Sequence, residues 1–172
     1  MITLAQMHDI LPHARSRVEL FCDALNDAMD VFNINTPQRQ AAFIAQIAHE
    51  SGELRYVREL ASGAAYEGRV DLGNVEPGDG QKFRGRGLIQ ITGRANYEKC
   101  GAALGLDLLE NPELLESPQN ACRSAAWFWL VRGCNELADA DNFRKITLRI
   151  NGGLNGYEGR LSYWETAKAV LA

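Results

Sequence analysis

The stretch FIAQIAHESGELRYVREL, residues 43–60, begins as a buried helix and then places a glutamate on its apolar side. Helical spacing puts Phe43, Ile47 and Glu50 on one face. An ionised carboxylate among core residues is costly to bury unless it is paired or hydrogen-bonded. Glu50 is therefore the first residue of this chain for which we expect a functional reason.

The bounds of this helix decide whether a second acid can work with Glu50. Thr36 followed by Pro37 predicts the start of the helix, and Gly52 predicts its end. Glu59 follows Glu50 by nine positions, which in a continuous helix is half a turn of rotation and about 13 Å along the axis. A site with both carboxylates therefore requires the chain to fold back after Gly52.

The remaining sequence predicts a mainly α protein with a single catalytic domain over residues 1–172. Apolar residues recur at helical spacing over about 13–32, after Ser117-Pro118, and over about 158–171. Residues 62–94 are rich in glycine, and we expect this segment to form one wall of a groove. Trp127, Phe128 and Trp129 are expected in the core.

Within the glycine-rich segment, LIQIT (residues 88–92) alternates apolar and polar residues. The alternation predicts a short extended or hairpin segment that presents Gln90 and Thr92 to solvent or to a cleft. Gly85 and Gly87, near or within it, would let another chain approach closely.

Composition excludes several classes of function. The chain has 172 residues, 46% of them hydrophobic, and a net charge of −4, whereas a nucleic-acid-binding domain is usually basic. Most charges of the short basic stretches, such as residues 82–86, are expected to lie on the solvated surface. No apolar run reaches the length of a membrane span. The first 17 residues lack the pattern of a signal peptide, which predicts synthesis in the cytoplasm.

Other catalytic motifs are absent. His49-Glu50 would need a histidine at position 53 to form HExxH, but Glu53 stands there. The three histidines are scattered, so we expect no metal and no cofactor. The four cysteines have no metal-ligand spacing and are expected to be free and buried. Paired carboxylates remain the most plausible catalytic chemistry.

A carboxyl group on an apolar helix face has a raised pKa, as a general acid requires. The structural alternative for Glu50 is an ion pair with Arg55 or Arg58. An inverting glycosidase holds its two carboxyl groups roughly 6.5–9.5 Å apart with a water between them. Glu59 is one candidate for the second acid. Spacing leaves three competitors open, Glu53, Glu67 and Glu76, and Glu67 is the strongest of them.

Three motifs in order resemble glycoside hydrolase family 19, and specifically its compact phage and prophage endolysin branch. They are FIAQIAHESGELRYVREL, YEGRVDLGNVEPGDGQKFRGRGLIQITGRANY and RINGGLNGYEGR. The resemblance spans about residues 36–172. It implies a lysozyme-like, mainly α fold with a substrate cleft between two lobes, and single-displacement hydrolysis of a β-1,4 bond to an N-acetylated amino sugar, with inversion.

The resemblance also implies roles for individual residues. Glu50 matches the general acid, Glu59 the general base, and Thr92 the residue that holds the attacking water. Gln90 and Asn96 match positions that contact the sugar.

Two further residues near the end of the chain are implicated. Asn151 matches a residue that binds the N-acetyl group, and Arg160 matches the arginine that orients the acidic pair. From the sequence alone, Asn151 could equally be a turn residue and Arg160 part of a surface salt bridge. Asn155 stands where the plant enzymes carry a further glutamate, so a third carboxylate in the network is in doubt.

We expect the substrate to be peptidoglycan, cut between N-acetylmuramic acid and N-acetylglucosamine. Chitin is the alternative substrate. A non-catalytic amino-sugar-binding module and a lytic transglycosylase, which needs one acid only, are the rival functions. We expect a monomer without membrane anchor or nucleic-acid partner, which acts on the cell wall after release through a separate holin pore.

Overall fold

The computed structural model describes residues 1–172, and its central element is helix α3 (Pro37–Ser51). The Thr36 side chain accepts a hydrogen bond from the Arg39 N–H, and proline occupies the first helical turn. The helix ends at Gly52 in the left-handed conformation, and the next two residues, Glu53 and Leu54, are also left-handed. Three such residues turn the chain sharply, so the predicted fold-back after residue 52 is confirmed.

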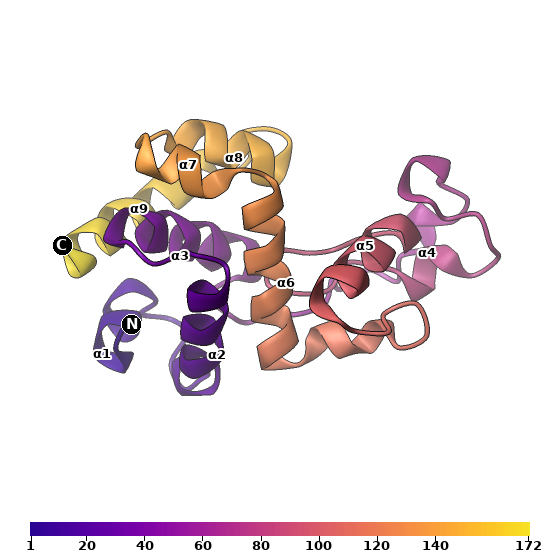
Figure 1. The fold of residues 1–172 in the computed structure, drawn as a ribbon, viewed down its shortest axis with the longest axis horizontal. Helices are drawn as coiled ribbons and strands as arrows, with labels where there is room; N and C mark the ends of the chain where they lie inside the picture. The colour runs from indigo at the N-terminus through magenta and orange to yellow at the C-terminus, as the bar shows by residue number, and fades with distance from the viewer.

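We call residues 1–56 and 118–172 the large lobe. It contains α1 (Leu4–Ile10), α2 (Arg17–Val31), α3, α6 (Pro118–Val131), α7 (Cys134–Asp139), α8 (Phe143–Asn151) and α9 (Tyr157–Leu171). Helix α3 packs most extensively against α9, and α2 packs against α6. Figure 1 shows α6 standing between this group of helices and the rest of the molecule. The mainly α fold class is confirmed.

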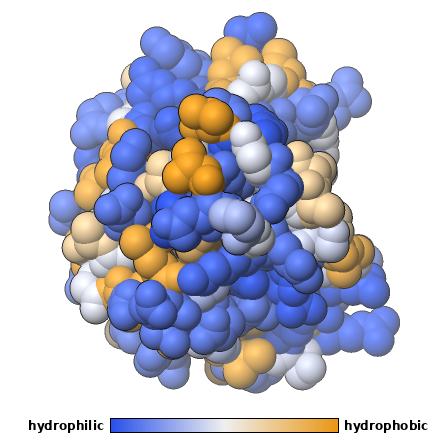
Figure 2. All heavy atoms as spheres, turned by 90° about the vertical axis from the view of Figure 1, so that its right-hand side faces the viewer, coloured by the Kyte–Doolittle hydropathy of each residue, from blue (hydrophilic) through white to orange (hydrophobic).

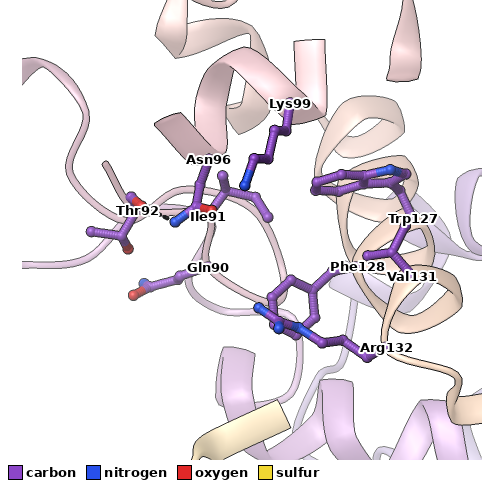
Figure 3. Close-up of a pocket in the computed structure, with 9 residues that line it drawn as sticks. All are labelled: Gln90, Ile91, Thr92, Asn96, Lys99, Trp127, Phe128, Val131 and Arg132. Carbon is purple, nitrogen blue, oxygen red and sulfur yellow. Dashed lines mark hydrogen bonds between the residues drawn. The ribbon is translucent and has the colours of Figure 1, made fainter. Parts of the chain in front are cut away.

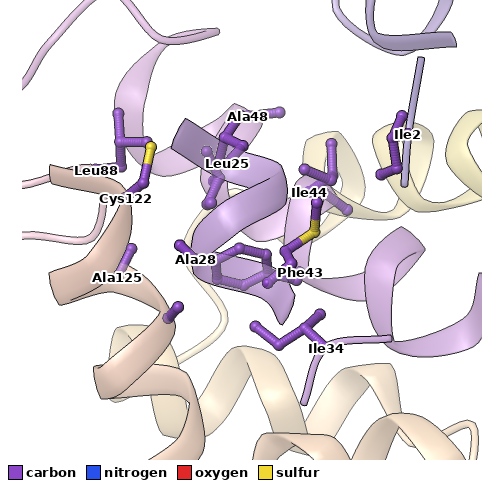
Figure 4. Close-up of a cluster of buried hydrophobic side chains, with 14 of the residues drawn as sticks. Ile2, Leu25, Ala28, Ile34, Phe43, Ile44, Ala48, Leu88, Cys122 and Ala125 are labelled. Carbon is purple, nitrogen blue, oxygen red and sulfur yellow. The ribbon is translucent and has the colours of Figure 1, made fainter. Parts of the chain in front are cut away.

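The large lobe is held by one apolar core of 33 buried residues. Figure 4 shows side chains from α2, α3 and α6 meeting in it. At this size, burial of apolar area is the main stabilising term for the lobe.

We call residues 57–117 the small lobe. It contains the short helices η1 (Ala64–Tyr66), η2 (Val70–Leu72), α4 (Asp79–Lys82) and η3 (Pro112–Glu116), together with the longer α5 (Arg94–Leu104). Its own core is a cluster of seven buried residues: Phe83, Ile91, Tyr97, Cys100, Leu104, Leu108 and Leu115. The end of the molecule formed by this lobe is mostly hydrophilic, with apolar atoms in small separate groups (Figure 2).

The segment LIQIT is not a strand, which corrects part of the expectation. Arg86 pairs with Ile91 in an antiparallel bridge, so residues 87–90 form the turn between them. Leu88 and Ile89 are both buried in the core of the large lobe, which breaks the alternation. Gln90 and Thr92 are nevertheless half-buried, as predicted for residues that face a cleft.

Gly85 and Gly87 lie close to other parts of the protein. A Cβ on Gly85 would lie 2.6 Å from Oε1 of Gln90. Gly87 has a φ of +100°, and its Cβ would lie 2.6 Å from the Ser124 hydroxyl on α6. Gly87 is therefore needed for the conformation and close packing of the turn, whereas at Gly85 the flexible Gln90 side chain could move aside.

Three other expectations can be compared with the structure. The helix expected from about residue 13 begins at Arg17. All four cysteines are free and buried, as predicted, and burial raises the pKa of Cys100 and Cys134 to about 12. None of the helices combines the length and the apolar character needed to span a bilayer.

Candidate active site

Glu50 lies near the end of α3, and its carboxylate contacts a buried arginine. Oε1 of Glu50 is 2.7 Å from Nη1 of Arg160 on α9. The Arg160 side chain is 1% exposed and that of Glu50 is 23% exposed. Neither alternative pairing survives: Glu50 is not paired with Arg55 or Arg58, and Arg160 is not in a surface salt bridge. The pair instead holds a carboxyl group at the boundary between core and solvent.

The Arg160 guanidinium is fixed by two further contacts. Nη1 donates to Oε1 of Gln46, 2.7 Å away, and the Gln46 amide donates in turn to the hydroxyl of Thr147 on α8. Nε of Arg160 donates to the carbonyl of Asn155. A buried guanidinium with fixed partners orients the carboxylate beside it.

Asn151 lies in the turn between α8 and α9. Its Oδ1 accepts a hydrogen bond from the N–H of Asn155, the residue whose carbonyl binds Arg160. Asn151 therefore does stabilise a turn, while its Nδ2 makes no hydrogen bond within the protein. The turn connects the predicted N-acetyl-binding residue to the Arg160–Glu50 pair.

Glu59 is held by the small lobe. Its Oε2 accepts a hydrogen bond of 2.9 Å from the Tyr66 hydroxyl, and its Oε1 accepts one of 3.1 Å from the N–H of Gly85. The backbone around Glu59 also pairs with residues 85–87. The Glu59 N–H donates to the Gly85 carbonyl, and the Gly87 N–H donates to the Val57 carbonyl. Burial and the Glu59 carboxylate raise the pKa of Tyr66, so the phenol stays a donor.

The three competing acids are engaged elsewhere. Both carboxylate oxygens of Glu67 accept backbone N–H groups, from Gly78 and Gly80, which lowers the pKa of Glu67. Glu53 is 4% exposed. Its oxygens accept from the N–H of His13 and the hydroxyl of Tyr163.

Glu76 forms an exposed ion pair with Arg94. Glu59 differs from these competitors in its location, because its carboxylate accepts the N–H of Gly85, next to the turn at residues 86–91.

Gln90, Thr92 and Asn96 line one cavity of about 380 Å³. The Gln90 amide and the Thr92 hydroxyl make no hydrogen bond within the protein, while Nδ2 of Asn96 donates to the Thr92 carbonyl. Gly85 joins this cavity to Glu59, because it binds the Glu59 carboxylate and packs against Oε1 of Gln90. Figure 3 shows the three polar side chains on one wall of the cavity.

The opposite wall contains residues that the sequence analysis did not assign to the site. Trp129 is fully buried as expected. Trp127 and Phe128 pack against the core of the small lobe, but they are only half-buried and also line the cavity. Lys99 and Arg132 complete the lining together with Ile91 and Val131. Helical spacing was the available signal, because Lys99 follows Asn96 by three positions and Arg132 follows Phe128 by four.

The comparisons with known proteins agree on one family. A family model described as glycoside hydrolase family 19, chitinase class I, matches residues 31–143. A protein of Haemophilus influenzae, named for its glycosyl hydrolase family 19 domain, is 32% identical over 93% of this chain and 92% of its own length. This chain belongs to glycoside hydrolase family 19.

Plant and bacterial chitinases are more distant relatives. The Arabidopsis thaliana endochitinase At2g43590 is 32% identical over 84% of the chain, which spans 56% of that protein. A bacterial family 19 chitinase superposes with a TM-score of 0.82 at 26% identity, covering 99% of this chain and 95% of its own. Chitinase C of Streptomyces griseus has a TM-score of 0.83 at 24% identity, covering 99% and 76%. These likenesses confirm the expected lysozyme-like fold.

Proposed function

We propose that this family 19 glycoside hydrolase cleaves the β-1,4 bonds of peptidoglycan with inversion, using Glu50 as the general acid and Glu59 as the general base. The observation that carries the proposal is the buried Arg160 beside a partly exposed Glu50. This arrangement keeps a carboxyl group in a fixed position and partly exposed to solvent, as a residue that protonates a glycosidic oxygen must be.

In this mechanism each residue has one task. Glu50 protonates the oxygen that leaves, while Glu59 takes a proton from a water that attacks the anomeric carbon from the opposite face. The free hydroxyl of Thr92 holds that water, and the Gln90 amide and Asn96 bind sugar hydroxyls or the acetamido group. Asn151 offers its unpaired Nδ2 to an N-acetyl group.

Replacement of the two acids tests these roles. Glu50→Gln and Glu59→Gln should each lower kcat on purified peptidoglycan by about 100-fold or more, because each removes a proton-transfer group. Glu67→Gln is the matched control, and its kcat should change little because Glu67 binds only the 78–80 backbone. Loss of activity in Glu67→Gln with retention in Glu59→Gln would overturn the assignment of the base.

The products separate this mechanism from its rivals. Mass spectrometry should find hydrated reducing ends, and NMR of the first product should find the inverted anomer. An anhydro-sugar one water lighter would identify a lytic transglycosylase. Sugar binding without any cleavage would identify a binding module.

Chitin is the second candidate substrate, because the solved neighbours and the plant relatives are named chitinases. Initial rates on peptidoglycan fragments and on N-acetylglucosamine oligomers of equal length decide between the two. Faster cleavage of the neutral oligomers would assign the enzyme to chitin.

A further inference from the structure

The cavity next to Thr92 has two cationic side chains that the proposed mechanism does not use. Lys99 comes from α5 and Arg132 from the end of α6, so the two reach the cavity from opposite walls. Figure 3 shows both side chains directed into the space between the walls. The lining contains no carboxylate.

Neither of these two cations has an acidic partner, in contrast to three arginines elsewhere in the structure. Arg86 pairs with Glu116, Arg94 with Asp79, and Arg160 with Glu50. Neither Lys99 nor Arg132 has a carboxylate oxygen within 4.0 Å. The cavity is therefore locally positive in a chain whose net charge is −4.

The surroundings give Arg132 a defined position. Its guanidinium lies 4.4 Å from the centroid of the Phe128 ring, a cation–π contact. The side chain makes no hydrogen bond within the protein, so its planar set of donors is free to bind a carboxylate through two parallel hydrogen bonds. Lys99 is exposed and adds a second, mobile positive charge.

The rest of the cavity is suited to an amino sugar. Trp127 and Phe128 offer aromatic surface to the apolar face of a pyranose ring, and Gln90 and Asn96 offer amides to its hydroxyl and acetamido groups. A sugar bound there would have any acidic substituent close to Lys99 and Arg132.

We propose that Lys99 and Arg132 form a subsite for the carboxylates carried by the substituents of an acidic amino-sugar polymer. In peptidoglycan every second sugar carries a lactyl ether extended by a peptide with ionised carboxylates. Chitin is neutral and offers nothing to these cations. The subsite rests on the proposed function and makes the enzyme selective for the acidic polymer.

The test compares two double variants with the same change in charge. Lys99→Gln/Arg132→Gln removes the cations of the cavity, and Arg144→Gln/Lys145→Gln removes two exposed cations from the distant helix α8. The kinetic readout is kcat/KM on peptidoglycan fragments and on N-acetylglucosamine oligomers of equal length, at low and high salt.

The cavity variant should lose about 10-fold or more in kcat/KM on peptidoglycan, mostly through KM, because charge-assisted hydrogen bonds to the substrate are lost. Its activity on neutral oligomers should stay within about twofold, and its dependence on salt should become weaker. The α8 variant should behave as the wild type. A charge-preserving variant, Lys99→Arg/Arg132→Lys, should retain most of the preference. Equal losses on both polymers, no loss on either, or an equal loss in the α8 variant would overturn the subsite.

A binding measurement keeps the subsite testable if the proposed function fails. Calorimetry with the Glu50→Gln protein compares a muramyl-peptide tetrasaccharide with the N-acetylglucosamine tetramer. The acidic ligand should bind more tightly, and the added Lys99→Gln/Arg132→Gln change should abolish the difference. Equal binding of the two ligands would overturn the subsite. Absence of peptidoglycan cleavage by the wild type would instead overturn the proposed function.

Discussion

The two lobes are stabilised by different interactions. The large lobe has a core of 33 buried apolar residues, whereas the small lobe has seven. The small lobe compensates with buried hydrogen bonds between arginines, carboxylates and backbone groups. Its stability therefore depends on ionisation, while that of the large lobe depends on packing.

Two buried ion pairs illustrate these interactions in the small lobe. The carboxylate of Asp79, which is 1% exposed, accepts two hydrogen bonds of 2.8 Å from Arg94 and one from the N–H of Glu76. Arg86 is 7% exposed and binds Glu116. Arg86 is therefore an exception to the expectation that most charges of residues 82–86 lie on the solvated surface.

The comparison bears on the site because each lobe holds one of the two proposed acids. Glu50 is oriented by Arg160 within the large lobe, and Glu59 by Tyr66 and Gly85 within the small lobe. A change that loosens the large lobe should therefore lower activity by misplacing Glu50, and one that loosens the small lobe should do so by misplacing Glu59. Three experiments test the different ways in which the lobes are stabilised.

The largest loss of stability is expected from a substitution in the core of the large lobe. Trp129 is fully buried, its ring lies 5.3 Å from that of Phe43, and its Nε1 donates to Asn135. Trp129→Ala should lower the free energy of unfolding by about 3–5 kcal/mol, because it leaves a cavity and a buried amide without its donor. Urea denaturation followed by circular dichroism measures the loss.

Leu130→Ala on the same helix is the control for Trp129→Ala. Leu130 is 38% exposed, so its truncation should cost less than about 1 kcal/mol. A loss below about 1 kcal/mol for Trp129→Ala would contradict the view that packing stabilises this lobe.

An intermediate effect is expected at Asp79 in the small lobe. The Arg94 hydrogen bonds lower the pKa of Asp79 below its ordinary value of 3.8. Since the folded state then binds fewer protons than the unfolded state, the stabilisation is complete above about pH 4 and is lost as pH falls through the lowered pKa. Asp79→Asn should cost about 1.5–3 kcal/mol at neutral pH, and the cost should shrink in acid.

Amide hydrogen exchange of α5 measures this change locally, with urea titrations between about pH 3 and 7 for the global stability. Asp71→Asn is the control, because the Asp71 side chain is 63% exposed. Unchanged protection of α5 at neutral pH, or the same acid sensitivity as the wild type, would show that Asp79 does not stabilise the small lobe.

The sequence predicted best what depends on local chemistry. Thr36, Pro37 and Gly52 defined α3, because caps and helix ends depend on neighbouring residues only. The position of Glu50 on an apolar face was visible from helical spacing. The partner of Glu50 could not be found from helical spacing, because Arg160 lies 110 positions away. Only the family resemblance pointed to it.

Other features required the tertiary structure. The two-residue alternation in LIQIT suggested an extended segment, but burial of both Leu88 and Ile89 against α6 overrides it. Trp127, Phe128 and Trp129 look alike in sequence, yet the packing of α5 against α6 leaves two of them beside the cavity. The engagement of Glu67 with the 78–80 backbone depends on a loop conformation that no motif specifies.

The smallest effect is expected at an exposed ion pair of the small lobe. Arg69 donates two hydrogen bonds to Asp71, but the two side chains are 47% and 63% exposed. Their interaction in a double-mutant cycle of Arg69→Gln and Asp71→Asn should be much smaller at low salt than the loss caused by Asp79→Asn, and should nearly vanish at about 1 M salt. The pair matches Asp79–Arg94 in chemistry and differs in burial. A coupling as large as the loss caused by Asp79→Asn would therefore mean that burial does not distinguish the two pairs. The small lobe would then rely on surface charge as much as on its buried ion pairs.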